Sequence, residues 1–142
     1  PTDLSETARG VARLYELGRE GLRIEVDVPD SCVADVDPDQ MRRALINLCE
    51  NAVQAMPRGG QLSLGVRVDG DHVEFRIADT GEGIAPDVLP RVFTPYYSTK
   101  ARGSGLGLAI VRSSIAACGG EVRFANRTPR GFRAELLFAA AG

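Results

Sequence analysis

The chain has 142 residues, of which 44% are hydrophobic and 25% are charged, with a formal net charge of -2. This is the length and composition of a single globular domain, and it excludes a disordered tail or a strongly basic nucleic-acid-binding surface. No apolar run reaches the ~20 residues needed to span a bilayer, and no signal peptide is recognisable. We therefore expect a soluble, cytoplasmic domain without direct membrane contact. Because the sequence begins at Pro1 rather than a methionine, we expect it to be cut from a longer protein whose other parts are free to carry a membrane anchor.

Hydrophobic periodicity predicts a helix, a strand and a longer helix in the first part of the chain. Apolar residues recur at the helical period over 4–20, and then alternate strictly with polar residues over 22–28, which is typical of a half-buried strand. Asp37 is a good N-cap, and Pro38 suits the first helical position. We therefore expect the second helix to run from 38 to about 56.

The remainder of the chain predicts two strands joined by a turn, then a helix and two final strands. These elements are expected over residues 62–68, 73–77, 106–117, 121–126 and 132–138. The stretch from 79 to 105 is long, rich in Gly and Pro and without periodicity, and loops of this kind inside compact domains are usually functional. The sum is an α/β (α+β) two-layer sandwich over 1–142. It has about five strands in a mixed or antiparallel sheet and three helices on one face.

Polar residues of the long helix form the first candidate site. Asn47 and Asn51 are four residues apart and share one face of that helix, with Arg43 a further turn toward its start. A solvated polar stripe would explain them. An asparagine carbonyl is also a hard oxygen ligand suited to Mg²⁺, which takes one or two protein ligands together with phosphate oxygens.

A glycine-rich turn opens the next predicted helix and is a candidate phosphate site. Glycines allow close backbone approach, and the first helical turn offers unpaired N–H groups and a positive dipole end to an anion. A flexible hinge is the alternative explanation. The turn is not a P-loop, because no Gly-Lys-Ser/Thr follows, and it is not a dinucleotide fingerprint, because no strand leads directly into it and the glycine spacing differs. It consists of Gly103, Ser104, Gly105, Leu106, Gly107 and Leu108.

A second glycine cluster follows an apolar strand. It reads Asp79-Thr80-Gly81-Glu82-Gly83-Ile84. In a purely structural interpretation, the aspartate hydrogen-bonds to the backbone of its own turn. In the functional one, a carboxylate at the mouth of an apolar pocket accepts a hydrogen bond from an exocyclic amine such as that of adenine, which would select adenine over guanine.

Together these segments resemble the ATP-binding catalytic domain of sensor histidine kinases, a member of the GHKL superfamily with the Bergerat fold. The segment 47–52 is similar to the N box and 79–84 to the G1 box. The segment 93–100, Phe-Thr-Pro-Tyr-Tyr-Ser-Thr-Lys, looks like the F box, and 103–108 resembles G2. The F-box-like run close to G2 is most similar to kinases of the nitrogen-regulation type, with a short ATP lid within 84–105.

The resemblance implies a role for each of these positions. Asn51 would coordinate Mg²⁺ and Asn47 would help to hold the metal or the phosphates, while Asp79 would bind the adenine amino group. Lys100, on the lid, would reach the γ-phosphate, although an ordinary solvated lysine is the alternative. The implied nucleotide contacts also include Gly81, Gly83, Ile84, Thr99 and the residues from Gly103 to Leu108.

The implied function is transfer of the γ-phosphate of Mg-ATP to a histidine on another domain. His72, the only histidine, lies at a turn and is expected to be structural, so the phosphoacceptor would lie on a dimerisation domain absent from this chain. The phosphate would then pass to a response regulator. We expect the isolated domain to be monomeric and the full protein to be a homodimer.

Two alternatives remain open within the superfamily. One is a protein-binding or serine-kinase module like the anti-sigma factors, and the other is a slow ATPase. The second is disfavoured because Asn47 stands where the hydrolysing branch has a glutamate, and an amide is not a general base near neutral pH. The chain also departs from the family at Phe132, where a small hydroxyl residue usually follows the final glycine, Gly131. A hydroxyl contact to adenine is therefore not expected.

Overall fold

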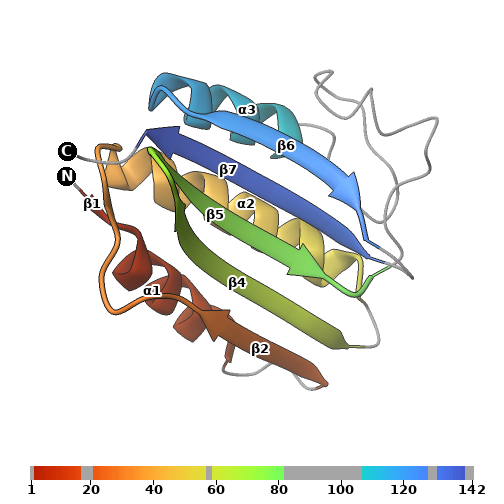
Figure 1. Ribbon diagram of the computed structural model, residues 1–142. Coiled ribbons are helices and arrows are strands. Elements are labelled where there is room, and N and C mark those ends of the chain that lie inside the picture. The colour runs from red at the N-terminus through yellow and green to blue at the C-terminus, as the bar shows by residue number, and fades with distance from the viewer. Residues whose placement is uncertain (1, 17–20, 57–58, 82–106, 128–130, 140–142) are drawn as a thin grey trace.

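The computed structural model describes residues 2–16, 21–56, 59–81, 107–127 and 131–139. Within them the chain forms two layers, a twisted sheet and three helices that cover one of its faces (Figure 1). The helices are α1 (Leu4–Glu16), α2 (Pro38–Gln54) and α3 (Gly107–Ala117). The strands are β1 (Thr2–Asp3), β2 (Leu22–Asp27), β3 (Val33–Ala34), β4 (Gly60–Asp69), β5 (His72–Asp79), β6 (Glu121–Asn126) and β7 (Phe132–Ala139).

The main sheet has five strands in the order β2-β4-β5-β7-β6. β2 pairs in parallel with β4, and every other neighbouring pair is antiparallel, so the sheet is mixed. β4 and β5 form the predicted hairpin, with Asp69 opposite His72 and Gly70 at a φ of 61° in the turn. The expected architecture, an α/β fold with three helices on one face of a five-stranded mixed sheet, is confirmed.

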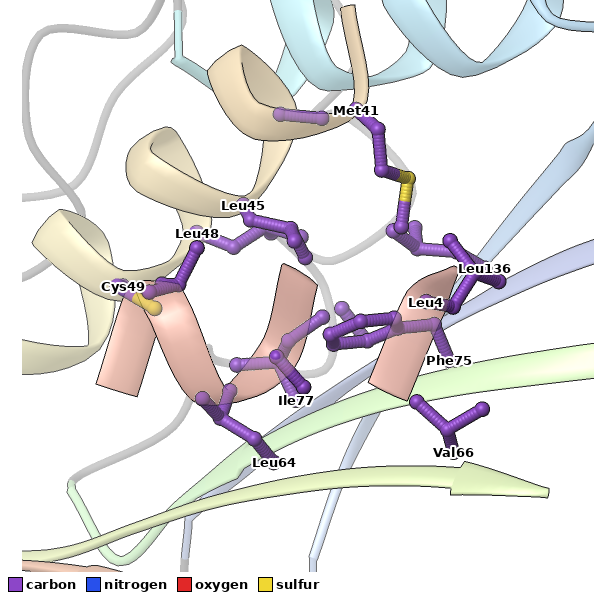
Figure 2. Close-up of a cluster of buried hydrophobic side chains, with 14 of the residues drawn as sticks. Leu4, Met41, Leu45, Leu48, Cys49, Leu64, Val66, Phe75, Ile77 and Leu136 are labelled. Carbon is purple, nitrogen blue, oxygen red and sulfur yellow. The ribbon is translucent and has the colours of Figure 1, made fainter. Parts of the chain in front are cut away.

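The hydrophobic core fills the space between the helices and the sheet (Figure 2). Alternate residues of β4, β5 and β7 point into it because successive side chains of a strand face opposite sides. Leu45 and Leu48 of α2 meet Leu64 and Ile77 of the sheet there. The predicted inward face of α2 is buried as expected, and it comprises Met41, Leu45, Leu48, Ala52 and Ala55.

Helix α2 begins where its capping signal predicts. The side chain of Asp37 accepts hydrogen bonds from the amides of Asp39 and Gln40 at 2.9 and 3.3 Å, and Pro38 stands at the first helical turn. The helix ends at Gln54 with Ala55 as C-cap, slightly before the expected end. The first helix likewise ends at Glu16, and the expected continuation over 17–20 lies outside the described residues.

A short two-stranded pairing of β1 with β3 was not predicted. Each strand has two residues, too few for a periodic pattern. Asp3 holds this region together, because its carboxylate accepts hydrogen bonds from the amides of Ser5 and Cys32 at 3.0 and 3.1 Å and from the hydroxyl of Ser31 at 3.0 Å. These bonds, that of the Cys32 amide above all, lower the pKa of Asp3. In the described part of the chain, no helix combines the length and apolar character that a membrane span requires.

Candidate nucleotide site

Three of the segments chosen from the sequence meet at one end of the molecule. Figure 1 shows the last residues of α2 and β5 at the same end, and α3 runs in the opposite direction to α2, so that its first turn also lies there. Helices α2 and α3 pack directly against each other. The fold thus brings Asn51, Asp79 and the start of the G2-like helix at Gly107 to one end of the two layers.

Asp79, the last residue of β5, is 2% exposed. Its Oδ1 accepts hydrogen bonds from the amide of Gly81 at 2.9 Å and from the amide of Phe132 at 3.2 Å. The first bond is the turn contact of the structural interpretation. A carboxylate offers about four lone-pair positions, so anchoring by two amides is compatible with a further donor from a ligand. The structural interpretation of Asp79 is therefore confirmed, and it is compatible with the functional one, which stays a prediction.

Close packing fixes the turn that follows Asp79. A Cβ on Gly81 would lie 2.6 Å from the carbonyl oxygen of Ala55, the C-cap of α2, so only glycine fits there. The hydroxyl of Thr80 accepts a hydrogen bond from the amide of Gln61, at the start of β4, at 3.1 Å. The described part of the G1-like turn is thus held between the end of α2 and the start of β4.

Gly131 and Phe132, at the start of β7, lie directly against Asp79. Gly131 has a φ of 118°, and a Cβ there would lie 2.1 Å from the carbonyl oxygen of Asp79. Phe132 is 4% exposed and packs against Phe124, with ring centroids 5.4 Å apart. Its side chain therefore fills core, while its amide takes part in holding Asp79.

Asn51 is 7% exposed, and its Nδ2 has no hydrogen-bond partner among the described residues. A simple solvated stripe does not account for this, because buried polar atoms are normally paired. Asn47, one turn earlier, is half-buried, and Arg43 is exposed. The polar face of α2 thus becomes progressively more buried toward the end where Asp79 lies.

The residues between the two asparagines have other roles. The Oε1 of Glu50 accepts a hydrogen bond of 2.7 Å from the hydroxyl of Tyr15, which ties α2 to α1. Burial, together with the charge of Glu50, raises the pKa of Cys49 to about 12, so this thiol stays protonated and unreactive. Glu50 is therefore engaged with α1, and it lies ~100° around the helix from Asn51.

The structure does not describe the remaining candidate residues in full. Only the backbone of Gly107 and Leu108, in the first turn of α3, is described. The other residues, and the F-box-like segment with them, lie outside the described ranges; they are Gly83, Ile84, Thr99, Lys100, Gly103, Ser104, Gly105 and Leu106.

Sequence reasoning missed Arg127, whose Nη1 donates a hydrogen bond of 2.9 Å to the carbonyl oxygen of Asp79. Arg127 belongs to none of the glycine or asparagine motifs, and an arginine between two strands has no distinctive local pattern. The only signal in the sequence was its position shortly before Gly131. Its contact with β5 depends on the pairing of β5 with β7, which is not local.

Comparison with known proteins agrees with this geometry. Residues 36–141 match the family of histidine kinase-, DNA gyrase B-, and HSP90-like ATPases. Sensor histidine kinase ZraS of Escherichia coli O157:H7 is 41% identical over 100 residues, which cover 70% of this chain and 22% of that protein. The structure of the mycobacterial sensor histidine kinase MprB superposes with a TM-score of 0.86 at 27% identity, covering 98% of this chain and 97% of that one.

A second solved structure, full-length ShkA in complex with AMPPNP, has a TM-score of 0.82 and 34% identity and covers 100% of this chain and 31% of that one. The chain belongs to the family of histidine kinase-, DNA gyrase B-, and HSP90-like ATPases. The resemblance to the ATP-binding domain of sensor histidine kinases is confirmed. The chain spans 22% of the length of the ZraS relative, so it corresponds to one part of such a protein.

Proposed function

We propose that this chain binds Mg-ATP where α2, β5 and the start of α3 meet, and donates the γ-phosphate to a histidine on a separate dimerisation domain. The phosphate would then pass to an aspartate of a response regulator in two-component signalling. The observation that carries the proposal is the buried carboxylate of Asp79, oriented by two amide donors at the same end of the fold as the buried amide of Asn51. The named relatives, which are sensor histidine kinases, support it.

Asp79 would recognise the base. Its carboxylate is held in place by the amides of Gly81 and Phe132, so it can accept a hydrogen bond from the adenine amine without first being ordered. Gly81 gives the base pocket its shape, because any larger residue would collide with Ala55. ShkA, which was solved with an ATP analogue and covers this whole chain, supports an adenine nucleotide as the ligand.

Asn51, with Asn47, would hold Mg²⁺ and the phosphates. Among the described residues no group of three His, Cys, Asp or Glu side chains is placed to bind a metal. A metal with one or two protein oxygens, completed by phosphates and water, suits such a site and is the usual arrangement for Mg²⁺. The amide of Asn51 fits, since the two ends of an amide are alike in shape and either can be turned toward a ligand. Bound Mg²⁺ would neutralise phosphate charge.

The roles of Lys100, Thr99 and the remaining glycines rest on the sequence resemblance. So does the assignment of the first turn of α3 as the triphosphate cradle, although the placement of Gly107 at this end of the molecule supports it. Catalysis would consist of positioning and charge neutralisation, as phosphoryl transfer generally requires. Asn47 cannot activate water, and Glu50 bonds Tyr15, so rapid hydrolysis of ATP is not expected.

A two-part experiment tests the proposal. Calorimetry should detect binding of ATP that is strengthened by Mg²⁺, and addition of the parent protein's dimerisation domain should give an acid-labile phosphoprotein, as expected for phosphohistidine. An acid-stable product would indicate phosphoserine and favour the anti-sigma-like alternative. Steady phosphate release by the chain alone would indicate an ATPase. No association at millimolar nucleotide and Mg²⁺ would refute the site itself.

A further inference from the structure

Arg127, just after β6, and Phe132, the first residue of β7, both hold Asp79 at the end of β5. The guanidinium Nη1 of Arg127 donates to the carbonyl oxygen of Asp79 at 2.9 Å, and the amide of Phe132 donates to its carboxylate. The amide of Arg127 also donates to the carbonyl oxygen of Gly131 at 2.9 Å, which closes the base of the connection. Arg127 therefore holds the main chain of Asp79 and Phe132 holds its side chain.

We propose that Arg127 is a positioning residue for recognition of the base: it fixes the main chain of Asp79, and through it the direction of the carboxylate that receives the exocyclic amine. This inference rests on the proposed function, in which Asp79 binds adenine. Arg127 itself makes no contact with the base in this scheme.

The position of Asp79 in the sheet explains why such a support is needed. Asp79 is the last residue of β5, and its partner Phe132 is the first residue of β7, so the ladder of backbone hydrogen bonds ends at this pair. The end of a strand is less constrained than its middle, because no further backbone pairs with the neighbouring strand follow it. A charged donor on the Asp79 carbonyl makes a stronger bond than a neutral one.

The space around the carbonyl oxygen shows that the contact is tightly built. Gly131 approaches it so closely that a Cβ would lie 2.1 Å away, and Arg127 reaches the same oxygen from a half-buried position. A rotation of the peptide after Asp79 would displace the amide of Gly81, which holds the carboxylate, and would redirect the carboxylate with it. Because hydrogen bonds weaken steeply with poor angles, a small rotation is enough to weaken the bond to the amine.

The test compares two nucleotides that differ in the amine alone, ATP and purine riboside triphosphate, which lacks it. Their affinities for the chain are measured by calorimetry at one Mg²⁺ concentration. Arg127→Ala is expected to weaken ATP binding about 3- to 10-fold, a part of what a charge-assisted hydrogen bond contributes, and to leave binding of the analogue unchanged. Arg127→Lys keeps a charged donor and should retain most of the affinity for ATP, which keeps the test valid if the alanine variant folds poorly.

Arg123→Ala is the matched control, because Arg123 lies on β6, is 63% exposed and pairs only loosely with Glu121 at 3.7 Å. It should change neither affinity. Equal weakening of both nucleotides by Arg127→Ala would show a general structural role and overturn the inference, and so would unchanged ATP binding. Asp79→Asn distinguishes failure of the inference about Arg127 from failure of the proposed function. If Asp79→Asn does not reduce the preference for ATP over the analogue, Asp79 does not bind the amine, and the proposed function is refuted at its base site.

Discussion

The proposed base-binding end around Asp79 and the proposed metal-binding face around Asn51 are built in opposite ways. Around Asp79, main-chain amides, the Arg127 guanidinium and close-packed glycines satisfy and fix the functional group before any ligand arrives. Around Asn51, a buried amide nitrogen has no partner among the described residues. The first arrangement stabilises the fold. The second leaves a polar atom unsatisfied among the described residues, and buried polar atoms are expensive to leave unpaired.

This difference predicts that substitutions at the two ends will affect the free energy of unfolding and the activity in different proportions. Changes at the base end should lower the free energy of unfolding and nucleotide affinity together. Changes at the metal face should remove activity and leave stability intact, as is common where function requires groups that folding does not satisfy.

The largest effect is expected for Asn51→Ala. If Asn51 holds Mg²⁺, phosphotransfer to the dimerisation domain should fall by ~100-fold or more, as for loss of a group that stabilises transition-state charge. The free energy of unfolding should change by less than about 1 kcal/mol, because an unpaired buried amide is removed. Radiolabel transfer and urea denaturation measure the two quantities, with Gln54→Ala, an exposed residue of the same helix, as control. Normal transfer by Asn51→Ala would contradict the metal assignment.

Gly131→Ala tests the end of the site around Asp79, where stability and ATP binding should be lost together. The new Cβ would collide with the Asp79 carbonyl at a φ of 118°, so the base end must move apart. We expect a loss of about 3 kcal/mol or more in the free energy of unfolding, together with weak ATP binding.

The matched control is Gly70→Ala, at a φ of 61° with no atom within 4 Å of the new Cβ. It carries only the cost of a left-handed backbone, roughly 1 to 2 kcal/mol, and should bind ATP normally. Equal losses for the two variants would mean that the collision at Asp79 is relieved at no cost.

Asp79→Asn should weaken ATP binding ~10- to 100-fold, as for a buried polar group left without its match. It should also destabilise the unliganded chain by about 1 kcal/mol, since the amides of Gly81 and Phe132 lose a charged acceptor. Calorimetry and urea denaturation provide the two values. A loss of affinity with no loss of stability would mean that Asp79, like Asn51, contributes to function and not to folding. The contrast between the two ends would then be wrong.

The smallest effect is expected for Tyr15→Phe. It removes the hydroxyl that bonds Glu50 on the side of α2 away from the proposed metal site, and should cost about 1 kcal/mol in the free energy of unfolding. ATP affinity and phosphotransfer should not change. Reduced transfer at unchanged stability would show that α1 is coupled to Asn51, and Leu14→Ala, an exposed neighbour on α1, is the control for surface effects.

Local pattern was sufficient for much of the fold. The period of two predicted the strands that pair as β4 and β5, and the residues Asp37 and Pro38 predicted the start of α2, because both signals act between near neighbours in the chain. The order of the asparagine and glycine segments predicted the family, since each segment carries its own chemistry. The two-residue strands β1 and β3 left no such trace.

By itself, the sequence determined the three helices and the five strands of the main sheet, the apolar face of each, and which residues are candidates for binding a nucleotide. Only the tertiary structure decided the strand order β2-β4-β5-β7-β6, the burial of the Asn51 amide and the convergence of Phe132, Gly131 and Arg127 on Asp79. The physical reason is range. Helix caps, turns and alternation depend on residues a few positions apart, whereas Arg127 reaches Asp79 across 48 positions because β5 and β7 pair in the sheet.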